Sequence, residues 1–166
     1  FRVPSVGAGT ANTEFETITG MSLRYFGPGE YPYKTILTQT TCESAPYILK
    51  KLGYSTHAIH NNEANFYARK SVFPMLGFDS FTSEEYMPDI SDITETGWVK
   101  DYILTDEIIK CLDATEGPDY VYTISVQGHG DYSTEPILDD PQITVTGAED
   151  REKNNYSWEY YVNQIH

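Results

Sequence analysis

A threonine follows two glycines near the start of the sequence, in the string Gly7-Ala8-Gly9-Thr10. Thr13 and Glu16 have the S/T-x-x-E spacing of a capping box, which predicts a helix over about residues 14–21. Free N–H groups and the positive dipole end at a helix start favour an anion beside Thr10. A hydroxyl held at an anion site is how a phosphoryl-transfer nucleophile would be presented. The alternative interpretation is a glycine turn capped by a threonine, with no chemistry.

Four histidines are candidates for the base or metal ligand that a threonine hydroxyl needs, because its pKa is too high for unaided attack. His57 is expected inside a strand and His166 at the end of a helix, which argues against a function for either. His60 is expected to support a turn. His129 lies between two glycines and is the strongest candidate to contact a phosphate.

Hydrophobic periodicity predicts helices that alternate with strands. One helix is expected to begin after Ser44, with Pro46 in its first turn, and to stop at Gly53. The other predicted helices cover residues 64–75, 100–113 and 155–166. The predicted strands are 54–59 and 120–126, and the predicted loops are 27–33 and 133–153. Residues 79–98 are turn-rich and acidic and show little periodicity. The second strand is apolar and β-branched enough to be a central one. This alternation predicts a three-layer α/β/α fold with a mostly parallel sheet.

Polar residues follow both predicted strands directly. His60-Asn61-Asn62 comes after the first strand, and Gln127-Gly128-His129 comes after the second. Binding groups in parallel α/β sheets collect in the loops at the carboxyl ends of strands. We therefore expect these two segments to converge on Thr10.

The composition limits the partners that this chain can have. At 166 residues, 39% of them hydrophobic, it is expected to form one domain with a substantial core. The net charge of −14 argues against a nucleic-acid partner and against unaided docking on an anionic bilayer; its alternative explanation is simple solubility. No run approaches the ~20 apolar residues that cross a membrane. Cys42 and Cys111 show no metal-binding spacing and are expected to be two buried thiols, with a disulfide between them as the alternative.

The string from Gly7 to Phe15, G-x-G-T-A-N-T-E-F, resembles the nucleophile segment of the lipoteichoic acid synthase family. These proteins are phosphoglycerol transferases of the alkaline phosphatase and sulfatase superfamily. The resemblance runs from about Val6 to the last residues, and the order and spacing of its motifs carry it. The further motifs are Gly53-Tyr54-Ser55-Thr56, His60-Asn61-Asn62, Phe66-Tyr67-Ala68-Arg69, Leu76-Gly77-Phe78-Asp79 and Gln127-Gly128-His129-Gly130-Asp131-Tyr132.

The resemblance implies a role for five residues. Thr10 matches the covalent nucleophile, which in the family also ligates a divalent metal, Mn²⁺ or Mg²⁺. Asn62, Tyr67, Arg69 and His129 match the pocket for the glycerol phosphate group. Arg69 can grip a phosphate bidentately and His129 can donate a hydrogen bond. Asn62 and Tyr67 replace an acidic residue and a tryptophan of the family, a change that affects the glycerol head group more than the phosphate.

The resemblance also implies that residues 1–166 are an incomplete fragment of an alkaline phosphatase-like catalytic domain. The family takes a metal-ligating Glu from a strand before the nucleophile and an Asp-His pair from a segment after the last helix, and this sequence contains neither. Because Mn²⁺ prefers about six hard ligands, we expect the fragment to bind metal weakly or not at all and to be inactive alone. Without the leading strand, an open sheet edge would be available for self-association.

The expected reaction of the parent protein is phosphoglycerol transfer from phosphatidylglycerol, an anionic phospholipid, through a phospho-threonine intermediate. Family members carry this domain outside the bacterial cell, tethered by upstream transmembrane helices. One alternative is a related sulfatase or phosphoethanolamine transferase. The segment Cys42-Glu43-Ser44-Ala45-Pro46 departs from the C/S-x-P-x-R context of sulfatases, which disfavours true sulfatase activity. The other alternative is a catalytically inactive fragment used for binding.

Overall fold

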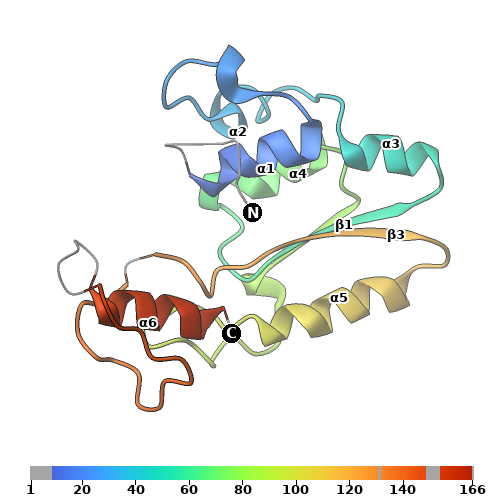
Figure 1. The fold of residues 1–166 in the computed structure, drawn as a ribbon. Helices are drawn as coiled ribbons and strands as arrows, with labels where there is room; N and C mark the ends of the chain where they lie inside the picture. The colour runs from blue at the N-terminus through green and yellow to red at the C-terminus, as the bar shows by residue number, and fades with distance from the viewer. Residues whose placement is uncertain (1–8, 131, 149–153, 166) are drawn as a thin grey trace.

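The computed structural model describes residues 9–130, 132–148 and 154–165, and its centre is a three-stranded parallel sheet (Figure 1). The strands β1 (Ser55–His60), β2 (Ser80–Ser83) and β3 (Asp119–Ile124) lie in the order β2-β1-β3. His60 is in register with Ser83 on one side and Ile124 on the other. The carboxyl ends of all three strands therefore meet at one edge of the sheet, and the sequence predicted this for β1 and β3.

Helices cover both faces of this sheet. They are α1 (Thr10–Thr19), α2 (Pro32–Thr35), α3 (Ala45–Lys51), α4 (Arg69–Met75), α5 (Tyr102–Ala114) and α6 (Asn155–Gln164). Three single 3₁₀ turns are η1 (Leu23–Tyr25), η2 (Phe66–Ala68) and η3 (Glu84–Tyr86). In Figure 1, α1 and α4 lie on one side of β1 and β3, and α5 lies on the other.

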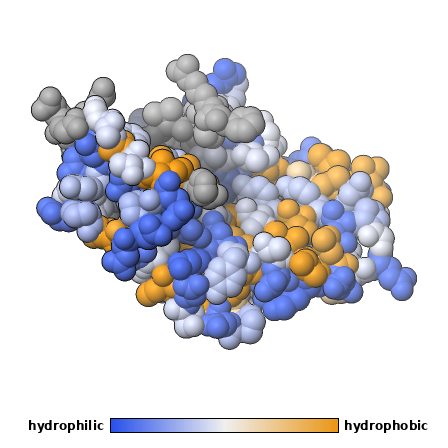
Figure 2. Space-filling model, turned by 60° about the horizontal axis from the view of Figure 1, so that its bottom comes forward, coloured by the Kyte–Doolittle hydropathy of each residue, from blue (hydrophilic) through white to orange (hydrophobic). Residues whose placement is uncertain are grey.

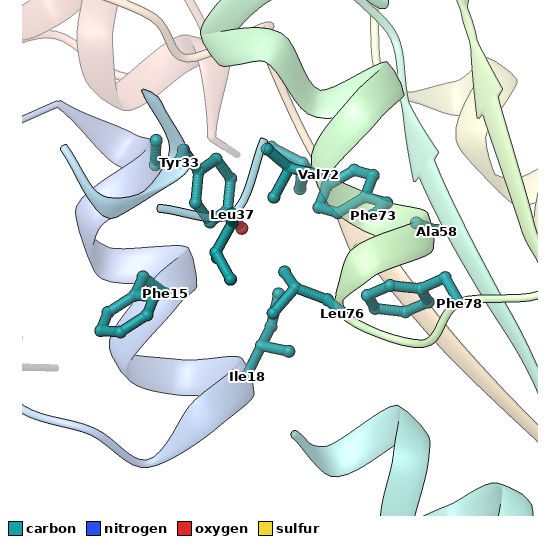
Figure 3. Close-up of a cluster of buried hydrophobic side chains, with 11 residues drawn as sticks. Phe15, Ile18, Tyr33, Leu37, Ala58, Val72, Phe73, Leu76 and Phe78 are labelled. Atoms are coloured by element: carbon teal, nitrogen blue, oxygen red, sulfur yellow. The ribbon is translucent and has the colours of Figure 1, made fainter. Parts of the chain in front are cut away.

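The core is divided into two clusters because successive side chains of a strand point to opposite faces. Ala58 of β1 packs with α1, α2 and α4, and Ile59, the next residue, packs with α5. Figure 3 shows the larger cluster, in which Ile18 of α1 lies beside Leu76, the residue after α4. Two helical layers with a parallel sheet between them confirm the predicted α/β/α architecture.

Local signals predicted α3 correctly. Ser44 is its N-cap residue, whose hydroxyl accepts a hydrogen bond from the Tyr47 backbone N–H at 3.4 Å. Pro46 lies in the first turn, where its missing N–H has no cost. The helix stops before Gly53, which has φ +88°, a backbone conformation that favours glycine.

The predicted start of the first helix was wrong. α1 begins at Thr10, not near residue 14, and Gly9 is its N-cap residue. Thr13 is therefore inside the helix, and the carboxylate of Glu16 accepts a hydrogen bond from the Leu23 N–H at 2.7 Å instead of capping the helix. The capping-box spacing is present in the sequence, but its acidic member bonds to the following loop.

Three further predictions need correction. Residues 79–98, predicted as a turn-rich segment without periodicity, contain β2, whose four polar and aromatic residues lack the hydrophobic run of a buried strand. The predicted central strand, β3, is an edge strand among the described residues, and β1 is central. The predicted helix over 64–75 is broken, because Tyr67 and Ala68 have φ of 56° and 60° and separate η2 from α4.

The remaining segments match the sequence more closely. Residues 132–148 contain no helix or strand, and α6 follows where a helix was predicted. Cys42 and Cys111 are separate, half-buried thiols, and burial raises the pKa of both. No helix in the described part of the chain is long and apolar enough to span a membrane. In Figure 2, the hydrophobic residues on the face turned toward the reader lie in separate groups among hydrophilic ones.

Candidate active site

Thr10 is an exposed residue at the amino end of α1. The first N–H groups of any helix have no intrahelical acceptor, so this end of α1 presents N–H donors and a positive dipole beside the Thr10 hydroxyl. The Gly9 N–H donates to the Tyr31 hydroxyl at 3.1 Å, which anchors the residue before Thr10. The structure thus places Thr10 where the sequence argument required an anion site, and Gly7 and Ala8 of the motif lie outside the described residues.

Tyr67 lies directly against the residue before Thr10. A Cβ atom added to Gly9 would overlap the Tyr67 hydroxyl and the ring carbon that carries it, so any larger residue here would have to displace the Tyr67 side chain. The left-handed backbone of Tyr67 directs its ring here, and such strain in a residue other than glycine is typical of functional sites. Burial, followed by the neighbouring Tyr31 phenol, raises the pKa of Tyr67, so its hydroxyl stays protonated at neutral pH.

Arg69 and Glu14 form a buried ion pair beneath this surface. The Arg69 Nε donates to Glu14 Oε2 at 3.1 Å, and Nη2 donates to Oε1 at 2.5 Å. Their side chains are 1% and 2% exposed. Nη1 also donates to the Phe66 carbonyl at 3.2 Å, so two of the five guanidinium N–H groups are not used in these contacts. Because Glu14 belongs to α1 and Arg69 is the first residue of α4, the pair joins the two helices. The guanidinium edge that the sequence analysis assigned to a phosphate is occupied by Glu14 in this structure.

His60 is the last residue of β1 and is buried. Its Nδ1 hydrogen bonds with the Ile124 carbonyl of β3 at 2.9 Å, where Nδ1–H is the donor. Burial, reinforced by the charge of Arg69, lowers the pKa of His60 to about 4. The imidazole is therefore neutral at physiological pH and joins two strands, as expected of a supporting residue.

Asn61 fixes the loops that follow the strands. Its Nδ2 donates to the Val99 carbonyl at 3.1 Å and to the Asp101 carboxylate at 2.9 Å, and its Oδ1 accepts from the Val126 N–H at 3.0 Å. The side chain is fully buried and uses both ends of its amide. This one residue therefore fixes the loop after β1, the loop after β3 and the residue before α5.

The five predicted site residues are only partly brought together. Thr10, Tyr67 and Arg69 are linked through Gly9 and Glu14, as described above. Asn62 accepts a hydrogen bond from the Glu63 N–H at 2.8 Å, and the exposed His129 lies beside Trp98, with ring centroids 4.6 Å apart. These two residues lie in the loops after β1 and β3 at the same edge of the sheet, each with neighbours of its own.

The two histidines that the sequence argued against are not part of this group. The ring nitrogens of His57 lie 2.7 Å from the Ser80 hydroxyl and 3.2 Å from the Asp119 carboxylate, so the side chain connects the three strands near their amino ends. His166 lies outside the described residues.

A metal site is not complete within the described residues. They contain no group of three or more His, Cys, Asp or Glu side chains that could hold a metal ion. A single threonine hydroxyl does not satisfy Mn²⁺ or Mg²⁺, which take about six ligands, mostly oxygen. The donors found here therefore do not fit the metal that the family resemblance implies.

A family model described as Sulfatase matches residues 2–166. The chain belongs to the sulfatase family. It is 36% identical over 130 residues to the Putative cyclic beta-1,2-glucan modification protein of Rhizobium meliloti. The aligned residues cover 78% of this chain and 20% of the relative. The sulfatase-family segment described here is thus about a fifth of the length of that relative.

Solved structures share the fold of this sulfatase-family chain. The phosphoglycerol transferase GacH of Streptococcus pyogenes, in complex with sn-glycerol-1-phosphate, has a TM-score of 0.75 at 24% identity, over 99% of this chain and 43% of that one. The lipoteichoic acid synthase LtaP of Listeria monocytogenes has a TM-score of 0.72 at 25% identity, over 94% and 38%. The matches confirm the resemblance inferred from the motifs.

Sequence reasoning missed four residues that shape this site. Glu14 lies in the motif of Thr10, and its position four residues later on a helix was a usable signal. Tyr31 lies in the predicted loop 27–33, and Lys34 directly follows it. Trp98 lies in the turn-rich segment 79–98. Neither segment has a hydrophobic periodicity that would indicate contact with the site. Their roles follow from long-range contacts that a sequence pattern does not encode.

Proposed function

We propose that this chain carries the nucleophile and part of the substrate pocket of a phosphoglycerol transferase. The observation that carries the proposal is the exposed hydroxyl of Thr10 at the amino end of α1, next to Tyr67 and above the Arg69–Glu14 pair. The positive end of the helix favours a phosphodiester at this position. Membership of the sulfatase family and the shared fold with phosphoglycerol transferases support this reaction class.

The proposed reaction has two steps. First, the Thr10 oxygen attacks the phosphorus of phosphatidylglycerol, the bond from phosphorus to the diacylglycerol oxygen breaks, and diacylglycerol leaves with the threonine proton. Second, an acceptor hydroxyl attacks the phospho-threonine, and its proton returns to Thr10. Tyr67 and Asn62 would orient the glycerol group, and His129 would donate a hydrogen bond to a phosphate oxygen. Arg69, which is buried and paired with Glu14, would act by holding α1 and α4 in place.

Similarity to the Rhizobium meliloti protein suggests the acceptor. The name of that relative refers to modification of a cyclic β-1,2-glucan, and its identity to this chain, 36%, exceeds that of the solved structures named above. We therefore favour a carbohydrate hydroxyl as the acceptor. This transfer would occur on the outer side of a bacterial membrane, where lipoteichoic acid synthases carry this domain.

Mass spectrometry of the full-length protein tests the proposal. After incubation with phosphatidylglycerol and Mn²⁺, the wild type should gain the mass of one phosphoglycerol group, and Thr10→Ala should not. Thr17→Ala, which removes an exposed threonine from the same helix, is the matched control and should keep the adduct. An adduct that persists in Thr10→Ala would overturn the proposal. An adduct formed from phosphatidylethanolamine instead would favour the phosphoethanolamine alternative.

The metal requirement is a separate part of the proposal. We expect chelation with EDTA to abolish adduct formation in the full-length protein and Mn²⁺ or Mg²⁺ to restore it. We also expect the 166-residue chain alone to form no adduct, because its described residues contain no metal-binding cluster. Adduct formation by the full-length protein in EDTA would contradict the metal requirement but not the role of Thr10.

A further inference from the structure

A cleft of about 620 Å³ opens beside the amino end of α1. Its walls come from α2 and the residues just before and after it, and from η2 with the residue before it. They combine aromatic rings with polar groups, from Tyr31, Lys34, Thr38, Asn65, Phe66 and Tyr67. The ring of Phe66 is 44% exposed although it lines a concave surface. An exposed aromatic ring in a polar cleft indicates a place where a ligand binds.

The cleft has a fixed shape. The rings of Tyr31 and Tyr67 are stacked, with centroids 5.4 Å apart and an angle of 23° between their planes. Phe66 meets Tyr67 edge to face at 4.6 Å. The Lys34 ammonium lies 5.2 Å and 5.4 Å from the centroids of Tyr31 and Tyr67, within the range of cation–π attraction. These contacts hold the aromatic wall in place without a ligand.

The same aromatic wall extends to the residue before the proposed nucleophile. The Tyr31 hydroxyl accepts the hydrogen bond from Gly9, and the Tyr67 hydroxyl lies where a Cβ atom of that residue would be. Tyr67 is therefore common to the proposed phosphoglycerol pocket and to this cleft. A molecule bound in the cleft would lie next to Thr10.

The chemistry of the walls fits a sugar ring. Aromatic faces pack against the apolar C–H face of a pyranose, while ammonium, hydroxyl and amide groups hydrogen bond with its hydroxyls. A lipid chain would leave Lys34, Thr38 and Asn65 without partners, which is costly in a cleft. A cationic ligand would be repelled by Lys34.

We propose that this cleft binds a sugar ring of the acceptor and presents one of its hydroxyls to the phospho-threonine at Thr10. The proposal deepens the phosphoglycerol transfer proposed above and rests on it for the role of the bound sugar. Binding itself requires neither a donor nor a metal, so it can be measured separately from transfer.

Titration of the 166-residue chain with a linear β-1,2-glucooligosaccharide, followed by NMR, tests this cleft. We expect saturable binding that Phe66→Ala weakens by about three- to tenfold, the effect of one lost aromatic contact. Lys34→Gln should weaken it as well. The matched controls are Tyr25→Ala and Lys51→Gln, which change an exposed tyrosine and an exposed lysine away from the cleft; both should bind as the wild type does.

Two results would overturn the proposal: no saturable binding, or binding that Phe66→Ala and Lys34→Gln leave unchanged. The Thr10 adduct assay reports separately on the proposed function. Binding in the cleft without an adduct in the full-length protein would refute the acceptor role but leave a carbohydrate site. An adduct without binding in the cleft would refute only the proposal made here.

Discussion

The buried pair of Glu14 and Arg69 should be strongly coupled in the free energy of unfolding. Neither side chain is more than 2% exposed, and two N–H···O bonds join them. Removal of one member leaves the other as an unpaired buried charge, which costs about 3–5 kcal/mol. Replacement of both by methionine removes both charges and keeps apolar volume, and costs much less. The Phe66 carbonyl then loses the guanidinium donor but keeps its hydrogen bond from the Arg69 backbone N–H.

A double-mutant cycle measures this coupling. Glu14→Met, Arg69→Met and the double variant are unfolded in urea at pH 7 and followed by circular dichroism. Each single variant should lose about 3–5 kcal/mol, and the double variant should lose clearly less than the sum, with a coupling energy of about 3 kcal/mol or more. Strict additivity of the two single losses would refute the reasoning.

An exposed ion pair in the same chain provides the matched control. Lys100 and Asp92 lie 2.8 Å apart, with 39% and 48% of their side chains exposed. Solvent screens exposed pairs of this kind, so the same cycle at these positions should show a coupling energy far smaller than that of the buried pair. The contrast isolates the effect of burial from that of charge.

Three further changes test other contacts of the site. The pKa of His60 is about 4 in the folded chain and 6.5 in the unfolded chain, so the unfolded chain binds more protons between these two pH values. The free energy of unfolding should therefore fall by about 3 kcal/mol as the pH drops from 6.5 to 4. His60→Gln should remove this loss, which urea unfolding at pH 7 and pH 4 would measure. Gly9→Ala should cost about 1–3 kcal/mol in thermal unfolding, and less when Tyr67→Ala makes room for the added methyl group. Asn61→Ala should cost about 3 kcal/mol, because the Val126 N–H loses its acceptor in the interior; a loss below 1 kcal/mol would contradict the role given to Asn61.

The sequence predicted the elements whose signals are local. Ser44, Pro46 and Gly53 define α3 because a cap, a first-turn proline and a glycine stop each act within a few residues. The predicted ends of β1 and β3 lie within two residues of the observed ends. An apolar run marks each strand, and the polar residues that follow mark its carboxyl end. The placement of Thr10 at a helix start followed from its glycines, although the helix begins earlier than the capping box suggested.

The rest depends on contacts between distant residues. Glu14 and Arg69 are 55 positions apart, and no local pattern pairs them. The left-handed backbone of Tyr67 and Ala68 is not a property of either residue type, so the break before α4 was not predictable. β2 is short and polar and is a strand because β1 pairs with it.

The strand register also implies an order of folding. The pairing of His57 with Ser80 closes a separation of 23 residues, while that of His60 with Ile124 closes 64. The longer closure costs about 1 kcal/mol more chain entropy, so β1, α4 and β2 should assemble before β3 joins them. Tyr67 and Arg69 lie between β1 and β2 in the sequence, so they belong to the part that should assemble first. The loop with His129 would arrive last, so the final pairing of the sheet is also the step that completes the candidate site.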